Sequence, residues 1–288
     1  MSKLDNLIVQ WSKSESEADE KAVLEYMETT EYQEMPYEDR NHLFITSSKL
    51  RGYEECPLAM NLKYIDREKV DVEEEDKDYF ILGRAVDDYL THGKEAFDEK
   101  YEFVSRRSEG SEKIQMTMSH KYIVENAIKE FYRQKMFPRD ITKKNIIWVQ
   151  DGFPFKVELD YFNLEDLRIG DFKLVADVLN FKPEDYLFQM AVYFYAVLRK
   201  YQKKCCADLF VLDKHKGWSR SHMWRYSIPT LEAQQDRIAL LTRMYIGSLR
   251  TGLWPMVDTS TEKGRKIAFD NPYYTKYEEF RTFTPSIL

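Results

Sequence analysis

Two short stretches in the middle of the chain carry acidic residues and a lysine at a spacing that can support chemistry. Asp171 and Lys173 lie two residues apart in a stretch where apolar and polar residues alternate, and Asp160 stands two residues after Glu158 in the preceding stretch. Residues two apart on a β-strand share one face of the sheet, so each pair should project together. A short turn over residues 163–166 would then set Asp160 beside Asp171.

Two carboxylates and a lysine on one sheet face suit the hydrolysis of a phosphate ester. Mg²⁺ prefers oxygen ligands, and it commonly uses one or two carboxylates together with water and substrate phosphate. Such an ion polarises a phosphoryl oxygen and helps to generate hydroxide, while a lysine positions the water or neutralises developing charge. From the spacing alone, an ion pair that only braces the sheet explains Asp171 and Lys173 at least as well.

The elements that must position these residues follow from periodicity. Apolar residues recur at helical spacing before and after the acidic stretches, and Pro183 with two acids marks the start of the second helix. The chain contains four acid–any–Lys triplets, and only the one at Asp171 lies on an expected strand. We therefore predict an α/β core with these elements in order: a helix over 117–137, strands over 146–150, 155–161 and 167–174, a helix over 183–202, a strand over 209–212 with a hairpin partner within 218–228, and a helix over 230–250.

The net charge of −7 at first argues against a nucleic-acid partner. Its location weakens that argument, because residues 1–46 hold eleven acids and four bases and so account for all of it. We predict an acidic N-terminal arm over 1–46 and one further domain over 47–288. The arm is interpreted as a solvated helix face, with a partner-binding segment or a lid that mimics DNA charge as alternatives.

Cysteine usage and hydropathy indicate where the protein works. The three cysteines, two of them adjacent, do not form a disulfide framework or a zinc motif. No apolar run reaches the roughly 18 residues of a membrane span, and the N-terminus has no cleavage-site pattern. These features favour a reducing, cytoplasmic compartment and exclude a membrane partner.

Further motifs flank the acidic residues in a fixed order. Gln189 and Tyr193 form a Q-x-x-x-Y pattern on the helix that follows Asp171-x-Lys173; by themselves they could be a polar stripe on an amphipathic helix. The other segments are Ser48-Lys49-Leu50, Cys56-Pro57, Gly83-Arg84-Ala85-Val86-Asp87 and Leu253-Trp254-Pro255. Over residues 47–255 this order resembles the PD-(D/E)XK nuclease superfamily, in particular its RecB-like and phage recombination exonuclease branch.

The resemblance implies a restriction-endonuclease-like core, in which a central mixed sheet is flanked by helices in α-β-β-β-α-β order, with helical N-terminal additions. It further implies Mg²⁺, replaceable by Mn²⁺, on Asp160, Asp171 and the backbone carbonyl of Phe172. Lys173 would position water, and Gln189 and Tyr193 would support the lysine and the scissile strand. Candidate DNA contacts in the proposed cleft are Ser48, Arg51, Lys63, Arg67 and Arg84.

Two positions depart from the pattern of the branch. Asp87 stands where many members have a metal-binding histidine, so it is either a further metal ligand or a surface residue. Some relatives carry an iron–sulfur cluster on one early and three late cysteines, but no cysteine follows Cys206 here. We therefore expect no cluster and expect Cys56 to be a buried small hydrophobic residue.

The expected function is a Mg²⁺-dependent deoxyribonuclease, most similar to phage exonucleases of the RecE and lambda types that act in DNA recombination or repair. The alternatives are a non-catalytic DNA-binding or scaffolding protein on the same fold and an endonuclease. Expected partners are DNA, a recombinase or single-strand-binding protein, and further copies of the chain. The expected location is the cytoplasm of a bacterium or of a phage-infected host cell.

Overall fold

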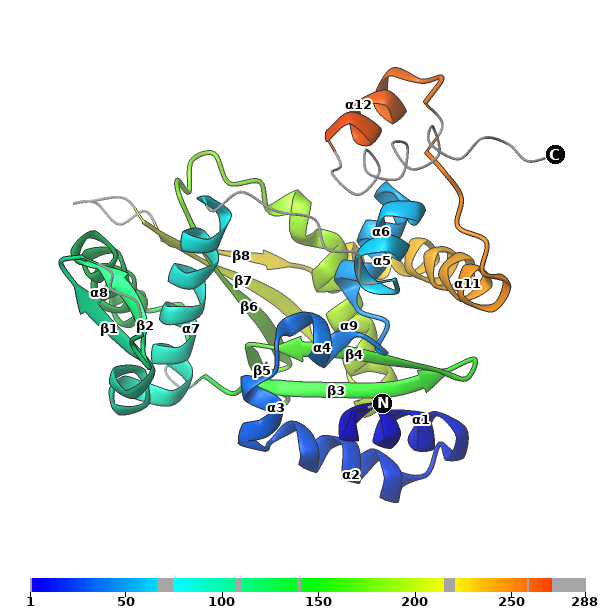
Figure 1. Cartoon of the computed structure of the whole chain (residues 1–288), viewed down its shortest axis with the longest axis horizontal. Helices are drawn as coiled ribbons and strands as arrows, with labels where there is room; N and C mark the ends of the chain where they lie inside the picture. The colour runs from blue at the N-terminus through cyan, green and yellow to red at the C-terminus, as the bar shows by residue number, and fades with distance from the viewer. Residues whose placement is uncertain are drawn as a thin grey trace. The chain divides into compact units, whose positions relative to one another are not determined.

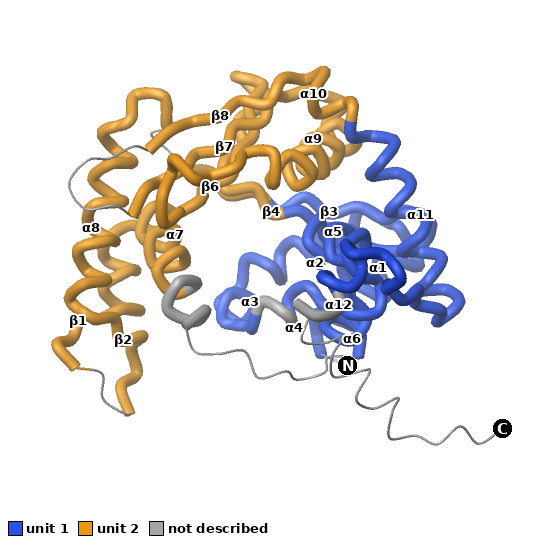
Figure 2. The backbone as a smooth tube through the Cα atoms, turned by 90° about the horizontal axis from the view of Figure 1, so that it is seen from above, with its two compact units in different colours: residues 1–71, 145–157, 234–288 blue, residues 72–144, 158–233 orange. Residues whose placement is uncertain are grey.

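The computed structural model describes residues 2–66, 75–106, 110–138, 141–214, 221–257 and 259–270 (Figure 1). The chain forms two compact units: residues 1–71, 145–157 and 234–288 make unit 1, and residues 72–144 and 158–233 make unit 2 (Figure 2). Both units contain helices and strands, which confirms the predicted mixed α/β class. Among the described helices, none is both long and apolar enough to cross a bilayer.

Unit 2 is built on a mixed four-stranded sheet. Its order is β5 (Tyr161–Asn163), β6 (Arg168–Val175), β7 (Cys206–Asp213) and β8 (His222–Tyr226). β6 and β7 run parallel, whereas β5 and β8 pair antiparallel at the two edges. Parallel neighbours need a long crossover. Here it consists of the 3₁₀ turn η1 (Pro183–Tyr186) and helix α9 (Leu187–Tyr201), in the place predicted for one helix.

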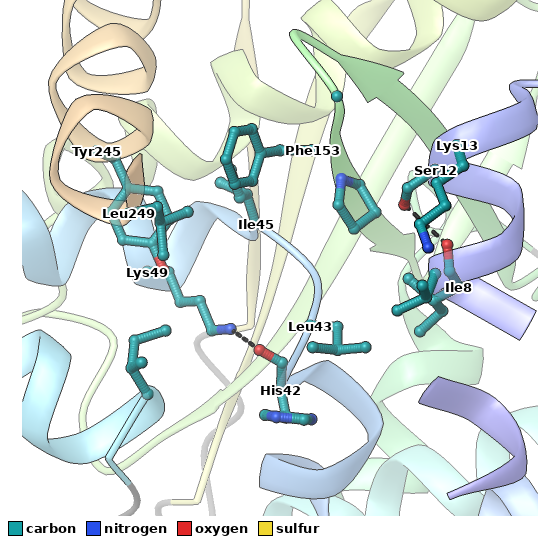
Figure 3. Close-up of a pocket in the computed structure, with 14 residues that line it drawn as sticks. Ile8, Ser12, Lys13, His42, Leu43, Ile45, Lys49, Phe153, Tyr245 and Leu249 are labelled. Atoms are coloured by element: carbon teal, nitrogen blue, oxygen red, sulfur yellow. Dashed lines mark hydrogen bonds between the residues drawn. The ribbon is translucent and has the colours of Figure 1, made fainter. Parts of the chain in front are cut away.

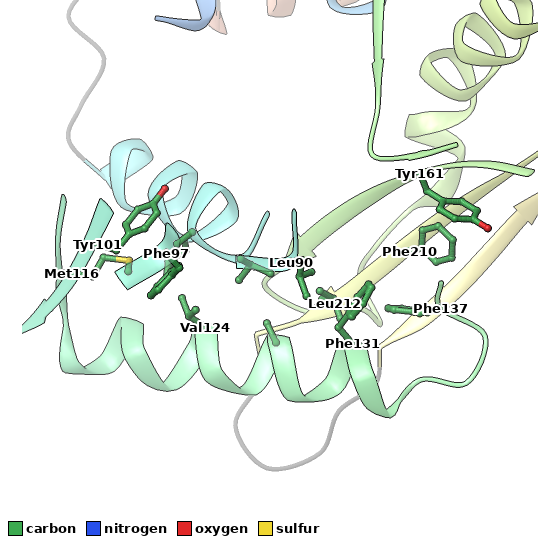
Figure 4. Close-up of a cluster of buried hydrophobic side chains, with 14 residues drawn as sticks. Leu90, Phe97, Tyr101, Met116, Val124, Phe131, Phe137, Tyr161, Phe210 and Leu212 are labelled. Atoms are coloured by element: carbon green, nitrogen blue, oxygen red, sulfur yellow. The ribbon is translucent and has the colours of Figure 1, made fainter. Parts of the chain in front are cut away.

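The alternation along β6 separates an apolar face from a polar face. Phe172 and Leu174 pack into an apolar cluster with residues of α7 (Glu75–Lys100) and α8 (Met118–Arg133), part of which Figure 4 shows. Asp171 and Lys173 project to the opposite face, where Gln189 of α9 contacts Asp171. Helices therefore flank the sheet on both faces, and the polar pair lies on the α9 side.

A glycine precedes Asp171 because two strands approach closely there. A Cβ atom at Gly170 would lie 2.5 Å from the Phe210 ring and 2.9 Å from the Asp208 carbonyl oxygen. The Phe210 ring stacks on Phe172 with centroids 4.8 Å apart. Gly170 thus lets β7 seat its aromatic residue against β6, which fixes the strand that carries Asp171 and Lys173.

The remaining strands differ from the prediction in two ways. Strands β3 (Lys144–Gln150) and β4 (Phe153–Leu159) form the expected hairpin, and its turn residues Asp151 and Gly152 both have positive φ, as a type I′ turn requires. They make a separate two-stranded sheet, however, so the predicted three-strand meander is not one sheet. The parallel pair β1 (Tyr101–Val104) and β2 (Ile114–Thr117) was not predicted, because each strand has only four residues and shows too little alternation to be recognised in the sequence.

Unit 1 joins the β3–β4 hairpin to helices from both ends of the chain. The N-terminal helices are α1 (Lys3–Ser14), α2 (Glu17–Met27), α3 (Thr30–Glu34), α4 (Tyr37–Asn41), α5 (Ser47–Glu55) and α6 (Pro57–Tyr64), and the C-terminal helices are α11 (Gln235–Thr251) and α12 (Glu262–Asp270). Helix α10 (Ile228–Glu232) belongs to unit 2. Gly252 ends α11 with φ of 69°, as predicted from its position after the helix.

The first 46 residues are packed rather than extended. Leu4, Ile8 and Trp11 of α1 are buried in one cluster with Ile147 and Val149 of β3. The acidic residues of α2 and α3 are largely exposed, so they cover the outside of a packed helical layer. The boundary predicted at residue 46 therefore falls inside unit 1, because helical spacing of a few large apolar residues is enough to anchor this acidic segment.

Candidate active site

The β5–β6 hairpin brings Asp160 to Asp171. Tyr161 pairs with Gly170 in the antiparallel register, and one further step places Asp160 opposite Asp171. The Phe172 backbone N–H donates a hydrogen bond of 2.8 Å to Asp160 Oδ2. Asp160 itself lies at the bend between β4 and β5, not inside a strand as predicted. The predicted neighbourhood of the two acids is nevertheless present.

The backbone of Phe172 faces the same side as Asp160. The N–H and C=O groups of one residue in an extended strand point toward the same edge, as shown by paired residues that exchange both bonds. Because the Phe172 N–H reaches Asp160, its carbonyl oxygen points toward that side as well. This orientation is the one that the predicted metal-binding role of the carbonyl requires.

Asp171 is held on both of its carboxylate oxygens. The side chain is 3% exposed, and Lys173 Nζ lies 2.5 Å from Oδ2. Gln189 Nε2 donates to Oδ1 at 3.1 Å, and the Tyr193 hydroxyl approaches the same oxygen at 3.4 Å. Gln189 Nε2 also donates to Tyr193 Oη at 2.7 Å, which leaves the tyrosine proton for Asp171.

Gln189 and Tyr193 therefore act on the carboxylate. They are four residues apart on α9, so both face the sheet. The resemblance implied support of Lys173 and of the scissile strand, whereas the observed hydrogen bonds run to Asp171. A further contact was not foreseen: the Tyr186 ring of η1 lies 5.5 Å from Lys173 Nζ, at cation–π distance. Its only sequence signal is its place at the start of the predicted helix.

Burial and crowding of acids shift the protonation equilibria of this cluster. Burial, reinforced by the charges of Asp171 and Asp87, raises the pKa of Asp160 well above its usual value. Burial alone would lower the pKa of Lys173, but Asp171 and Asp160 outweigh it and the net shift is upward. Burial and the same two acids raise the pKa of Tyr193. Lys173 and Tyr193 are therefore hydrogen donors at neutral pH.

A second acid–lysine pair adjoins Asp160. Asp87 of α7 forms an ion pair with Lys143, which directly precedes β3. Burial raises the pKa of Asp87, and Lys143 opposes this shift only in part. Asp87 was a predicted site residue and Lys143 was not, because in the sequence Lys143 cannot be distinguished from its exposed neighbour Lys144.

The predicted DNA contacts are not gathered with these residues in one unit. Ser48, Arg51 and Lys63 are exposed on α5 and α6 of unit 1, where Arg51 pairs with Glu55 and Lys63 lies over the Tyr64 ring. Arg84 is exposed on α7 of unit 2, the helix that carries Asp87. Arg67 lies outside the described residues.

The donor set fits a hard divalent cation that keeps several waters. Among the described residues, no three acidic, histidine or cysteine side chains form a complete metal cage. Asp160 and Asp171 interact, Asp171 Oδ2 is buried with the Lys173 ammonium beside it, and the Phe172 carbonyl faces the same side. Two carboxylates and one carbonyl plus water are typical of Mg²⁺ sites.

Unit 1 contains a pocket of different character (Figure 3). Its volume is about 400 Å³, and apolar side chains such as Ile45, Phe153 and Leu249 form most of its lining. The ammonium of Lys49 donates to the carbonyl oxygens of Asn41 and His42 at 2.8 and 2.7 Å. None of the predicted catalytic residues lines this pocket.

Comparison with known proteins supports the fold. No family model matches the sequence, and no curated protein matches it either. The crystal structure of a "Putative exonuclease" from Eubacterium rectale is similar, with a TM-score of 0.61 and 14% identity, over 83% of this chain and 92% of that chain. At this identity the similarity shows a shared fold and leaves function to the site.

Proposed function

We propose that the chain is a divalent-metal-dependent deoxyribonuclease with a PD-(D/E)XK core, acting as an exonuclease. The observation that carries the proposal is the placement of Asp160, Asp171 and Lys173 at one end of the β5–β6 hairpin, with Asp171 fixed on both oxygens. The fold shared with the "Putative exonuclease" supports the choice of reaction. The exonuclease assignment rests on that likeness and on the motif order.

Different residues of the chain would bind the metal ion and orient the carboxylates during phosphodiester hydrolysis. A divalent cation held by Asp160, Asp171 and the Phe172 carbonyl would polarise a phosphate oxygen and lower the pKa of water. Gln189 and Tyr193 keep the Asp171 carboxylate from rotating, and the Phe172 N–H does the same for Asp160. Such fixed donors need no reorganisation during the reaction, which is the advantage of a preorganised site.

Lys173 acts as a charge and a hydrogen donor. Its raised pKa keeps it protonated at neutral pH, so it does not serve as the base that removes a proton from water. One face of its ammonium contacts Asp171, and the side chain is 26% exposed, which leaves protons for a water molecule or a phosphate oxygen. Charge on the scissile phosphate would thus be stabilised beside the carboxylates.

The test of the proposal compares DNA substrates for the full chain. Linear duplexes labelled at the 5′ or the 3′ end, closed circular duplex and linear RNA are incubated with Mg²⁺, Mn²⁺ or EDTA. We expect mononucleotides from linear DNA with either metal and no product in EDTA. Cleavage of closed circular DNA would contradict the exonuclease assignment and indicate an endonuclease. Binding of DNA without any cleavage would favour the non-catalytic alternative.

A further inference from the structure

Lys143 is tied to the candidate active site by its backbone neighbour. Thr142 Oγ1 donates to the Phe162 carbonyl at 2.7 Å and accepts from the Phe162 N–H at 3.3 Å. Phe162 belongs to β5, the short strand that starts directly after Asp160. Two hydrogen bonds therefore hold the segment that carries Lys143 against the strand that carries Asp160.

The Lys143 ammonium lies among three carboxylates. It is ion-paired with Asp87, and the charges of Asp160 and Glu158 also act on it. Its side chain is 24% exposed, so it is neither a core lysine nor a freely solvated one. The charge of Asp87 in turn acts on Asp160. A cation thus already pairs with the α7 acid, and the charge of the acid of the β5–β6 hairpin acts on the same cation.

We propose that Lys143 takes the place of a second bound cation, so that this site holds one divalent ion and Asp87 is not one of its ligands. The inference rests on the proposed metal-dependent function and adds its metal stoichiometry. In sites with two metals, the second ion supplies further positive charge beside the reacting oxygens. Here a protein ammonium, which requires no free metal, supplies positive charge beside the acids.

The ion pair of Asp87 agrees with one ion. A second divalent cation beside Asp87 would have to displace the Lys143 ammonium from it, whereas an ion on Asp160 and Asp171 would not. Removal of that ammonium should therefore create the second position.

The test measures Mn²⁺ binding to the full-length protein by isothermal titration calorimetry, without DNA. We expect one Mn²⁺ in the wild type and two in Lys143→Met, with the first ion bound about tenfold more tightly because a repelling charge is gone. Lys143→Arg keeps the charge and should bind one. Lys144→Met, which removes the exposed neighbour, is the matched control and should match the wild type. Adding Asp87→Asn to Lys143→Met should return the stoichiometry to one.

The outcomes separate this inference from the proposed function. Two Mn²⁺ ions in the wild type, or one in Lys143→Met with unchanged affinity, would overturn the inference, while DNA hydrolysis by the wild type would leave the function standing. If the wild type binds one Mn²⁺ ion, Lys143→Met binds two, and the wild type does not hydrolyse DNA, the inference would be supported and the nuclease assignment would be wrong. If Lys143→Met does not fold, Asp87→Asn decides: a hundredfold loss of Mn²⁺ affinity would identify Asp87 as a ligand and contradict the proposal.

Discussion

Lysines in the two units differ in burial. In unit 1, Lys49 and Lys156 are 1% and 3% exposed; Lys49 donates to two backbone carbonyls, and Lys156 donates to the Tyr32 hydroxyl and the Asn41 side chain. In unit 2, Lys143 and Lys173 remain partly exposed and pair with Asp87 and Asp171.

The difference in burial separates a structural lysine from one that a substrate can reach. A fully buried ammonium has its hydrogen bonds fixed by the fold, and solvent does not reach it. An ammonium that shares carboxylates with a neighbouring acid can exchange its partners when a cation or phosphate arrives. The comparison predicts that lysine substitutions in the two units will damage different properties.

The largest effect is expected from the same substitution made in both units. Lys173→Ala should lower the rate of DNA hydrolysis by about 10³-fold or more, because a preorganised charge at the reacting group is lost, and it should leave DNA binding in place. Lys156→Ala should leave the rate per folded molecule unchanged but lower the free energy of unfolding by about 2–4 kcal/mol through lost packing and unsatisfied acceptors. Single-turnover rates and urea unfolding measure the two properties.

Lys129→Ala serves as the control for this pair, because Lys129 is exposed on α8 of unit 2 and should change neither property. The comparison breaks down if Lys156→Ala abolishes hydrolysis while the protein remains folded. It also breaks down if Lys173→Ala unfolds the protein and retains its rate per folded molecule.

A smaller effect is expected for the residues that hold Asp171. Gln189→Leu removes the hydrogen bond to Oδ1 and the one to Tyr193, and we expect a fall of about 10–100-fold in kcat with little change in KM. Tyr193→Phe removes only the 3.4 Å contact and should cost less. Steady-state kinetics on linear duplex DNA would show this order. An equal increase in KM for both variants, with kcat unchanged, would instead assign Gln189 and Tyr193 to substrate binding.

The sequence predicted the placement of the candidate site residues better than that of their surroundings. Alternation along β6 was sufficient to place Asp171 and Lys173 on one face, and the spacing of Gln189 and Tyr193 was sufficient to face both toward the sheet. Lys143 was not predicted, because its position depends on the contact between Thr142 and Phe162. These residues are twenty apart in the sequence, so the periodicity of neighbouring residues does not reveal their contact. The packing of the N-terminal helices was not predicted for the same reason, because residues of the distant strand β3 form part of their hydrophobic core.

The smallest expected effect is a pH dependence of stability in the metal-free protein. The pKa of Asp160 is raised above 3.8 on folding, so the folded state binds the proton more tightly than the unfolded state. Stability should therefore fall as pH rises from about 4 through the raised pKa. Asp160→Asn removes this loss, so in EDTA its urea midpoint at pH 7 should exceed that of the wild type, and the two should converge toward pH 4. A constant gap across this range would contradict the shift.

The acid–lysine cluster of unit 2 is the proposed centre of metal-dependent DNA hydrolysis. Its most direct test is the rate of nucleotide release from linear duplex DNA in Mn²⁺, measured for the wild type and for Asp171→Asn, with circular dichroism to verify folding. We expect release by the wild type, none in EDTA, and a loss of about 10³-fold or more in the variant. A folded Asp171→Asn protein that retains the wild-type rate would contradict it.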